Sequence, residues 1–269
     1  MAQVACETCH IPTSVAAAAE QYHWTVIHTD GTPRTVVRGA DGAVESADTL
    51  ITGFDPVILQ RIEEDGSKRL APCNLIGSWF WAHGTPERPV RLIDLEAAYL
   101  DGDDYAPDVV AAFHGNGNGD GDISEGELAI DDDIKEDLIR TRLAERGLEN
   151  PHIAAELQPY TIAHGITAGS WAIRDCQVCH SSDSRLSKAM PVGAYVPGGV
   201  LPTFVGDSDT ETTGSLNVTD DGQLWYAPET TSGDVEVLGN DRGGWADWIG
   251  IAVFLLVLIG ITVHGIIRV

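Results

Sequence analysis

The stretches Cys6-Glu7-Thr8-Cys9-His10 and Cys176-Gln177-Val178-Cys179-His180 hold four of the five cysteines in two copies of the pattern C-x-x-C-H. This spacing is typical of c-type haem attachment, in which the two thiols bond to the haem vinyl groups and the histidine binds the iron. A redox dithiol or half of a zinc site also uses C-x-x-C. The doubled motif favours two covalently bound haem c groups, attached through Cys6, Cys9, His10, Cys176, Cys179 and His180.

Each haem iron needs a second axial ligand if it is six-coordinate. Other histidines of the soluble part are the candidates, namely His23, His28, His83, His114, His152 and His164. His164, twelve residues before Cys176, is the first choice for a distal ligand and His28 is the second. Each is equally compatible with a surface or core position. The fifth cysteine, Cys73, has no partner at attachment spacing, and we expect it to be a buried free thiol.

Residues 249–267, IGIAVFLLVLIGITVHGII, contain a single ionisable side chain, His264. The stretch is long enough for one transmembrane helix and longer than most buried core helices, which are the alternative. Trp245 and Trp248 precede it at the position of an aromatic belt, and Arg268 follows it. An intramembrane histidine is a functional candidate. His264 is predicted to contact a haem b or a quinone shared with a partner's helices, or simply to be hydrogen-bonded near the interface.

Covalent haem attachment takes place outside the cytoplasm, so we expect the haem-bearing part to be exported. It would lie on the periplasmic or extracellular side of the cytoplasmic membrane, with the C-terminus cytoplasmic, as Arg268 also indicates. Residues 1–20 lack a basic region followed by an apolar region. The expectation is therefore a processed chain or a piece of a longer one.

Residues 116–127, NGNGDGDISEGE, are similar to the calcium-binding loop of an EF-hand. Oxygen ligands fall at the required loop positions, with the turn glycine Gly121 at position 6. Helices at 107–114 and 125–146 would flank the loop, and a Gly/Asn-rich solvent loop is the alternative. The predicted calcium ligands are Asn116, Asn118, Asp120, Asp122 (through its carbonyl), Ser124 and Glu127.

The composition is strongly acidic, with 41 Asp and Glu against 16 Lys and Arg and a formal net charge of −25. This composition argues against a nucleic-acid-binding protein, which needs a basic surface. It also excludes docking on anionic lipid through a polybasic patch. An acidic, lysine-poor surface fits a halophilic protein, in which salt screens self-repulsion, and fits simple solubility equally well.

Short strands are predicted in residues 20–44, which alternate in polarity around Asp30-Gly31 and Asp41-Gly42. Helices are predicted at 92–100 and 152–157, and a hairpin at Asp221-Gly222. The aromatic run at 79–81 would pack on haem or in an ordinary core. The predicted fold class is α+β, a loop-rich multihaem cytochrome c domain with an EF-hand-like insertion and one C-terminal transmembrane helix. The predicted segments are a first haem region with short strands at 1–103, the calcium-binding insertion at 104–147, the second haem region at 148–190, a small β segment or stalk at 191–244 and the anchor at 245–269.

Three runs resemble parts of the multihaem cytochromes of the octahaem tetrathionate reductase type. They are IRTRLAERGLENPHIAAELQPYTIAHG at 139–165, DCQVCHSSDSR at 175–185 and VHGIIR at 263–268. The resemblance implies periplasmic multihaem electron transfer, often tied to a membrane cytochrome b. The reductases of that family carry many more C-x-x-C-H motifs and a catalytic haem with an unusual ligand, whereas this chain has two ordinary motifs.

The sequence therefore favours a membrane-anchored dihaem cytochrome c, the electron-transfer subunit of a respiratory or photosynthetic complex. It would relay electrons between a membrane quinone or cytochrome b and a periplasmic redox protein. The alternative is a small multihaem reductase of a sulfur or nitrogen oxyanion, with one open-coordinate haem. A third hypothesis is a calcium-stabilised scaffold subunit whose haems are incidental.

Overall fold

The protein is described by a computed structural model that covers residues 3–41, 49–114, 123–181, 183–206, 209–229 and 244–267. The α-helices are α1 (Cys6–His10), α2 (Leu92–Tyr99), α3 (Pro107–Phe113), α4 (Asp133–Glu145) and α5 (Gly244–Ile267). Short 3-10 helices are η1 (Gly169–Trp171), η2 (Cys176–Val178), η3 (Arg185–Ser187) and η4 (Pro197–Gly199). The strands are β1 (Ala18–Ile27), β2 (Pro33–Arg38), β3 (Ala40–Asp41), β4 (Leu50–Ile51), β5 (Val57–Ile62), β6 (Lys68–His83), β7 (Arg88–Pro89), β8 (Leu100–Asp101), β9 (Asp104–Tyr105), β10 (His152–Thr161), β11 (Met190–Gly193), β12 (Thr203–Phe204), β13 (Thr210–Glu211), β14 (Gly214–Val218) and β15 (Leu224–Pro228).

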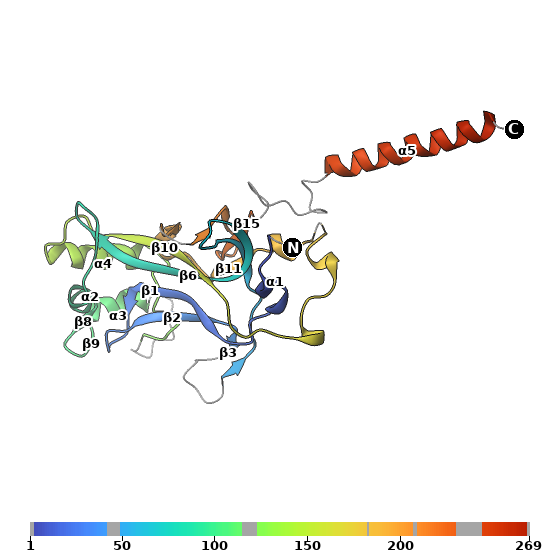
Figure 1. The fold of residues 1–269 in the computed structure, drawn as a ribbon. Coiled ribbons are helices and arrows are strands. Elements are labelled where there is room, and N and C mark those ends of the chain that lie inside the picture. Colours follow the sequence, from blue (N-terminus) through green and yellow to red (C-terminus); the bar gives the residue numbers. More distant parts are fainter. Residues whose placement is uncertain are drawn as a thin grey trace.

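The 16-residue strand β6 is the spine of an eight-stranded mixed sheet. Its first half pairs antiparallel with β5 and its second half pairs antiparallel with β10. On the edge of β6 opposite β10, β1 runs parallel to it, with Gln21 opposite Gly77 and Trp24 opposite Phe80. Strands from three of the predicted segments, 1–103, 148–190 and 191–244, thus meet in one sheet (Figure 1).

The aromatic run at 79–81 lies in the protein core. Trp79 and Trp81 are fully buried, and they pack with Tyr99 in the main apolar cluster. Both Trp81 Nε1 and the Tyr99 hydroxyl donate to the carbonyl of Thr25, at 3.0 and 2.6 Å, so their buried polar atoms are satisfied. Cys73 is also fully buried, as expected. The body of the protein therefore has a side-chain core of its own.

Two predicted helices differ from the structure. Residues 152–157 belong to strand β10, where Ile153, Ala155 and Leu157 alternate on the buried face of the sheet. Buried side chains recur every two residues in this run, as in a strand, and not every 3.6 residues, as in a helix. The helix predicted at 125–146 begins only at Asp133, after the side chain of Asp132 caps it by accepting from Lys135 N. The preceding residues 128–130 are buried against the core in a non-helical conformation.

Other local predictions are confirmed. β1 and β2 form an antiparallel pair whose turn contains Gly31 at φ +80°, a conformation that glycine adopts readily. The helix predicted at 92–100 is α2. The hairpin around Gly222 joins β14 to β15, with Val218 opposite Leu224.

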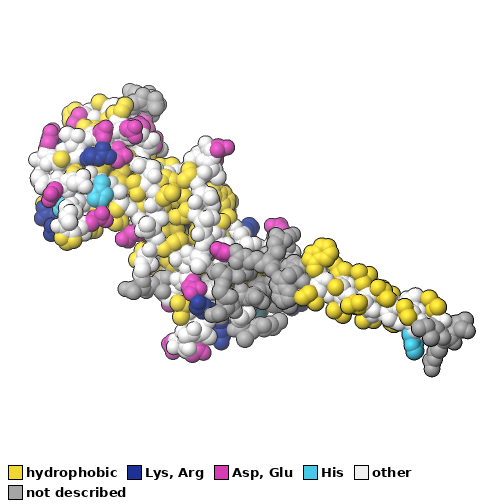
Figure 2. Space-filling view, turned by 90° about the horizontal axis from the view of Figure 1, so that it is seen from above, with side chains coloured by type: hydrophobic (Ala, Val, Ile, Leu, Met, Phe, Trp, Pro, Cys, Tyr) yellow, Lys and Arg dark blue, Asp and Glu magenta, His cyan; other side chains and the backbone are white. Residues whose placement is uncertain are grey.

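The apolar stretch near the C-terminus forms a single helix, α5. Residues Trp248–Ile266 are long and apolar enough to cross a membrane, with a mean hydropathy of 2.6, by length and composition. The side chains described in this span are exposed, and Figure 2 shows them as an apolar surface beside a body that carries many acidic groups. The chain is therefore a mixed α/β protein with one C-terminal apolar helix.

Candidate dihaem site

The first C-x-x-C-H motif forms helix α1, which lies against the start of β6. The carbonyl oxygen of Leu70 accepts from Ala5 N at 2.9 Å and from Thr8 Oγ1 at 2.6 Å. Thr8, one of the two residues between the cysteines, is fully buried. Cys6 and Cys9 are free thiols, and Cys6 is exposed. The sheet thus fixes the backbone of the motif and leaves its first thiol accessible.

The ring of His10 is oriented by a hydrogen bond to the backbone. His10 Nδ1 lies 2.7 Å from the carbonyl oxygen of Thr167. A carbonyl can only accept, so Nδ1 is the donor, and in a neutral ring with this tautomer Nε2 has the free lone pair. This is the arrangement of a metal-ligating histidine, whose other ring nitrogen donates to a backbone carbonyl or carboxylate. The orientation of His10 is therefore the one that axial ligation through Nε2 would require.

The second motif folds as the 3-10 helix η2 and the turn after it. Asp175 caps this helix by accepting from Gln177 N at 2.9 Å, and His180 N donates to the Cys176 carbonyl at 2.9 Å. The buried Ser184 donates its hydroxyl to the Cys179 carbonyl at 2.8 Å. Cys176 is an exposed free thiol, and His180 is exposed. Short capped turns therefore hold this motif.

The structure brings the two motifs together across more than 160 residues of chain. Arg185, which follows motif two, donates Nη1 to the Thr8 carbonyl and Nη2 to the Ile11 carbonyl, each at 2.8 Å. Ile173, which precedes motif two, donates its N–H to the Cys9 carbonyl at 2.9 Å. Burial raises the pKa of the Cys179 thiol, and the nearby Cys9 thiol raises it further. Both motifs thus belong to one site.

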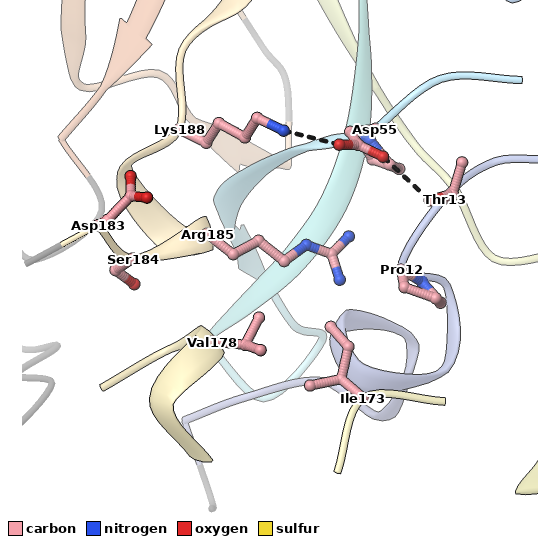
Figure 3. Close-up of a pocket in the computed structure, with 10 residues that line it drawn as sticks. Pro12, Thr13, Asp55, Ile173, Val178, Asp183, Ser184, Arg185 and Lys188 are labelled. Carbon is pink, nitrogen blue, oxygen red and sulfur yellow. Dashed lines mark hydrogen bonds and ion pairs between the residues drawn. The ribbon is translucent and has the colours of Figure 1, made fainter. Parts of the chain in front are cut away.

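A cavity of about 450 Å³ opens beside the paired motifs (Figure 3). Arg185 extends into it, and Asp55 on its wall accepts from Lys188 Nζ at 2.7 Å and from Thr13 Oγ1 at 3.0 Å. The lining combines apolar and polar groups, from Pro12, Thr13, Asp55, Pro56, Ile173, Val178, Asp183, Ser184, Arg185 and Lys188. A volume of this size is in the range of cofactor and ligand pockets.

The donor set fits covalently attached haem better than the alternatives. The four motif cysteines are free thiols. Within the described residues no group of three or more His, Cys, Asp and Glu side chains is placed to hold a metal ion. The hydrogen bond from His10 Nδ1 leaves Nε2 for an iron. These observations match what haem c requires of its motif.

The predicted distal ligands occupy different places. His164 is exposed on the connection between Ile162, whose N–H donates to Pro72, and Thr167, which contacts His10. That connection lies on the side of motif one. His28 follows β1, and its Nε2 is 3.6 Å from a carboxylate oxygen of Glu125, so the structure does not bring it to either motif. His264, predicted to contact a haem b or a quinone and not as a distal ligand, is exposed on α5. Their roles as ligands stay predictions.

The predicted calcium loop lies only partly within the described residues. Asn116, Asn118, Asp120 and Asp122 lie outside them. Glu127 accepts through Oε2 from Ser124 N at 2.8 Å and from Ser124 Oγ at 2.6 Å. Its Oε1 is 3.4 Å from His114 Nδ1. Both hydrogen bonds that involve Ser124 lower the pKa of Glu127. Calcium binding at this loop stays a prediction.

Comparison with known proteins adds one similarity. No protein-family model matches the chain, and no curated protein matches it. Among solved structures it is similar to the crystal structure of octaheme cytochrome c from Shewanella oneidensis, with 12 % sequence identity and a TM-score of 0.34. The match covers 68 % of this chain and 44 % of that one, so this chain spans under half of that protein's length.

Sequence reasoning missed the residues that orient the motifs. Thr167 orients the His10 ring through its backbone carbonyl, which no side-chain pattern reveals. Ser184 donates to a backbone carbonyl five residues before it, and Arg185 donates to a carbonyl 177 residues away, so side-chain spacing predicts neither partner. One signal was available, because Arg185 is one of only 16 basic residues and follows His180 by five positions.

Proposed function

We propose that this chain is a membrane-anchored dihaem cytochrome c that relays electrons within a respiratory or photosynthetic membrane complex. When bound, haem c supplies a one-electron iron couple. The observation that carries the proposal is the pairing of two C-x-x-C-H motifs in one site, with His10 oriented through Nδ1. Covalent attachment would use Cys6 and Cys9 at one haem, and Cys176 and Cys179 at the other.

The protein's residues would supply position and protection. The Leu70 carbonyl and the guanidinium of Arg185 fix the backbone of motif one, and Ser184 fixes that of motif two. Two haem sites held together by these contacts would pass an electron with little rearrangement of the protein. Such a relay would move one electron from one haem site to the other, with no bond formed or broken in the protein.

The apolar helix α5 supports a role at a membrane. It would be a single-pass anchor, with the haem-bearing body outside the cytoplasm and the C-terminus cytoplasmic. The partners would be a membrane quinone or cytochrome b on one side and a periplasmic redox protein on the other. His264 would face a quinone or a haem b shared with a partner helix, since polar groups within a bilayer gather where function requires them. We further propose that calcium binds the loop at 116–127 as a structural ion.

Ligand binding to the oxidised iron tests the relay against the alternative, a small reductase. The full chain is purified in detergent, and its visible and electron paramagnetic resonance spectra are recorded with and without cyanide and nitrite. A relay predicts two six-coordinate, low-spin sites that neither ligand changes. A high-spin signal, or a spectrum that moves with nitrite, would favour the reductase of a nitrogen or sulfur oxyanion.

A further inference from the structure

Three consecutive residues after the second motif each contact a different part of the dihaem site. Ser184 donates to the Cys179 carbonyl in motif two. Arg185 donates to the carbonyls of Thr8 and Ile11 in and beside motif one. Leu186 is buried against Ile58 and Leu70 of the sheet. The segment therefore ties both motifs to each other and to β5 and β6.

The guanidinium of Arg185 is suited to this task. Its planar fork donates two hydrogen bonds of 2.8 Å in fixed relative directions, which the single ammonium of lysine cannot reproduce. The two carbonyls it holds lie three residues apart around α1, so the contact fixes the orientation of that helix. Arg185 is half-buried, so its contacts are less exposed to competing water.

The charge of Arg185 lies near both attachment sites. Its side chain reaches motif one from a backbone that is six residues beyond Cys179, and it extends into the cavity between Pro12 and Val178 (Figure 3). Two acidic groups also face this cavity. Asp55 is engaged with Lys188 and Thr13, and Asp183 is exposed to solvent. Arg61 also lies near motif one, with its Nη1 3.7 Å from a carboxylate oxygen of Glu7. Arg185 differs from it in donating directly to the backbone of the motif and extending into the cavity.

We propose that Arg185 is a positioning residue shared by the two haem sites, which fixes their spacing and raises the reduction potential of both. This inference rests on the proposed dihaem function. Reduction adds one electron to an iron centre, so a nearby positive charge favours the reduced form. In a partly buried setting one unit charge shifts such an equilibrium by about tenfold. For a one-electron couple that corresponds to about 59 mV.

The test compares three variants of the full chain in detergent with the wild type. Arg185→Gln removes both the charge and the planar guanidinium. Arg185→Lys keeps the charge and removes the planar guanidinium. The matched control is Arg174→Gln, which removes the same charge from an exposed arginine near motif two. Haem content is counted for every sample, both potentials are titrated with visible spectroscopy, and paramagnetic resonance reports the magnetic coupling between the oxidised irons.

Arg185→Gln is expected to lower both reduction potentials, with a decrease of about tenfold in the equilibrium constant for reduction of each haem. Arg174→Gln is expected to change that equilibrium constant by less than about threefold, because salt screens an exposed charge. Arg185→Lys should keep both potentials and change the coupling between the irons. The inference is overturned if Arg185→Gln matches the control, if one haem alone responds, or if Arg185→Lys leaves the coupling unchanged. If Arg185→Gln loses a haem, the inference is judged on Arg185→Lys, and it is overturned if that variant leaves the coupling between the irons unchanged.

Failure of this inference and failure of the proposed function are distinguishable. A wild-type chain without two haems refutes the function before any variant is compared. A wild-type chain with two haems whose potentials and coupling ignore Arg185 refutes the inference alone.

Discussion

His10 and Thr167 hold each other through three hydrogen bonds. The Thr167 carbonyl accepts from His10 Nδ1 at 2.7 Å, while the Thr167 N–H and hydroxyl donate to the His10 carbonyl at 2.7 and 2.9 Å. The two residues are 157 positions apart in sequence. This pair therefore fixes both the ring and the backbone of the proposed axial ligand from the far half of the chain.

Replacing Thr167 with valine removes the hydroxyl bond and keeps both backbone bonds. We expect a loss of about 1 kcal/mol in the free energy of unfolding, the usual net value of one hydrogen bond, with two haems retained. Chemical denaturation followed by circular dichroism measures it. The control is Thr35→Val on the exposed face of β2, which should cost less than about 0.5 kcal/mol. Equal losses in the two variants would show that the Thr167 hydroxyl contributes nothing specific.

The five cysteines make a thiol count informative. In the native protein Cys73 is buried, and burial raises its pKa to about 12, so it should resist alkylation. If the other four cysteines are thioethers, the denatured protein should expose one thiol per chain to a chromogenic thiol reagent. The variant Cys73→Ala should then expose none and still carry two haems. A count of five would contradict covalent attachment.

The buried His23 predicts a pH dependence of stability. Burial, with a smaller contribution from Arg34, lowers the pKa of His23 to about 3. The ring is fully buried and stacks between Trp79 and Tyr195, at 5.8 and 5.1 Å between centroids. Below pH 6.5 the unfolded chain binds a proton at this position while the folded chain does not. The stability that comes from burying a neutral His23 is therefore fully present above pH 6.5, and it is lost as the pH falls from 6.5 toward 3.

The variant His23→Phe keeps an aromatic ring in the stack and cannot titrate. Relative to it, the wild type should lose about 1.4 kcal/mol of unfolding free energy for each pH unit between 6.5 and 3. Denaturation curves at pH 7, 6, 5 and 4 measure the difference. Parallel pH profiles of the two proteins would mean that His23 is not buried as a neutral base.

Calcium binding at the loop 116–127 should depend on Glu127. The ion would have to replace the two hydrogen bonds that Glu127 accepts from Ser124. We expect a dissociation constant of about 10⁻⁴ to 10⁻³ M, typical of extracellular sites, and a rise in the thermal midpoint on adding calcium. Glu127→Gln should abolish that rise. If wild type and variant respond alike, the loop is not the site.

The parts of the fold that depend on local pattern could be predicted, and those that depend on distant partners could not. The turn at Gly31, the helix α2 and the hairpin at Gly222 follow from periodicity and turn residues. Residues 152–157 are apolar enough for a short helix, but the alternation of Ile153, Ala155 and Leu157 places them in strand β10. The contacts that hold the motifs use the backbone carbonyls of Thr8, Ile11 and Thr167 as acceptors. Every residue has such a carbonyl, so the sequence does not show which of them will accept.

The haem content of the full chain tests the central claim most directly. The purified protein is examined by visible spectroscopy, as isolated and after dithionite, with a pyridine haemochrome assay and the mass of the denatured chain. The account predicts two haems per chain that remain attached on denaturation, with sharp low-spin bands that cyanide does not move. A chain mass without covalent haem would contradict it, and would turn attention to metal binding by the same four cysteines.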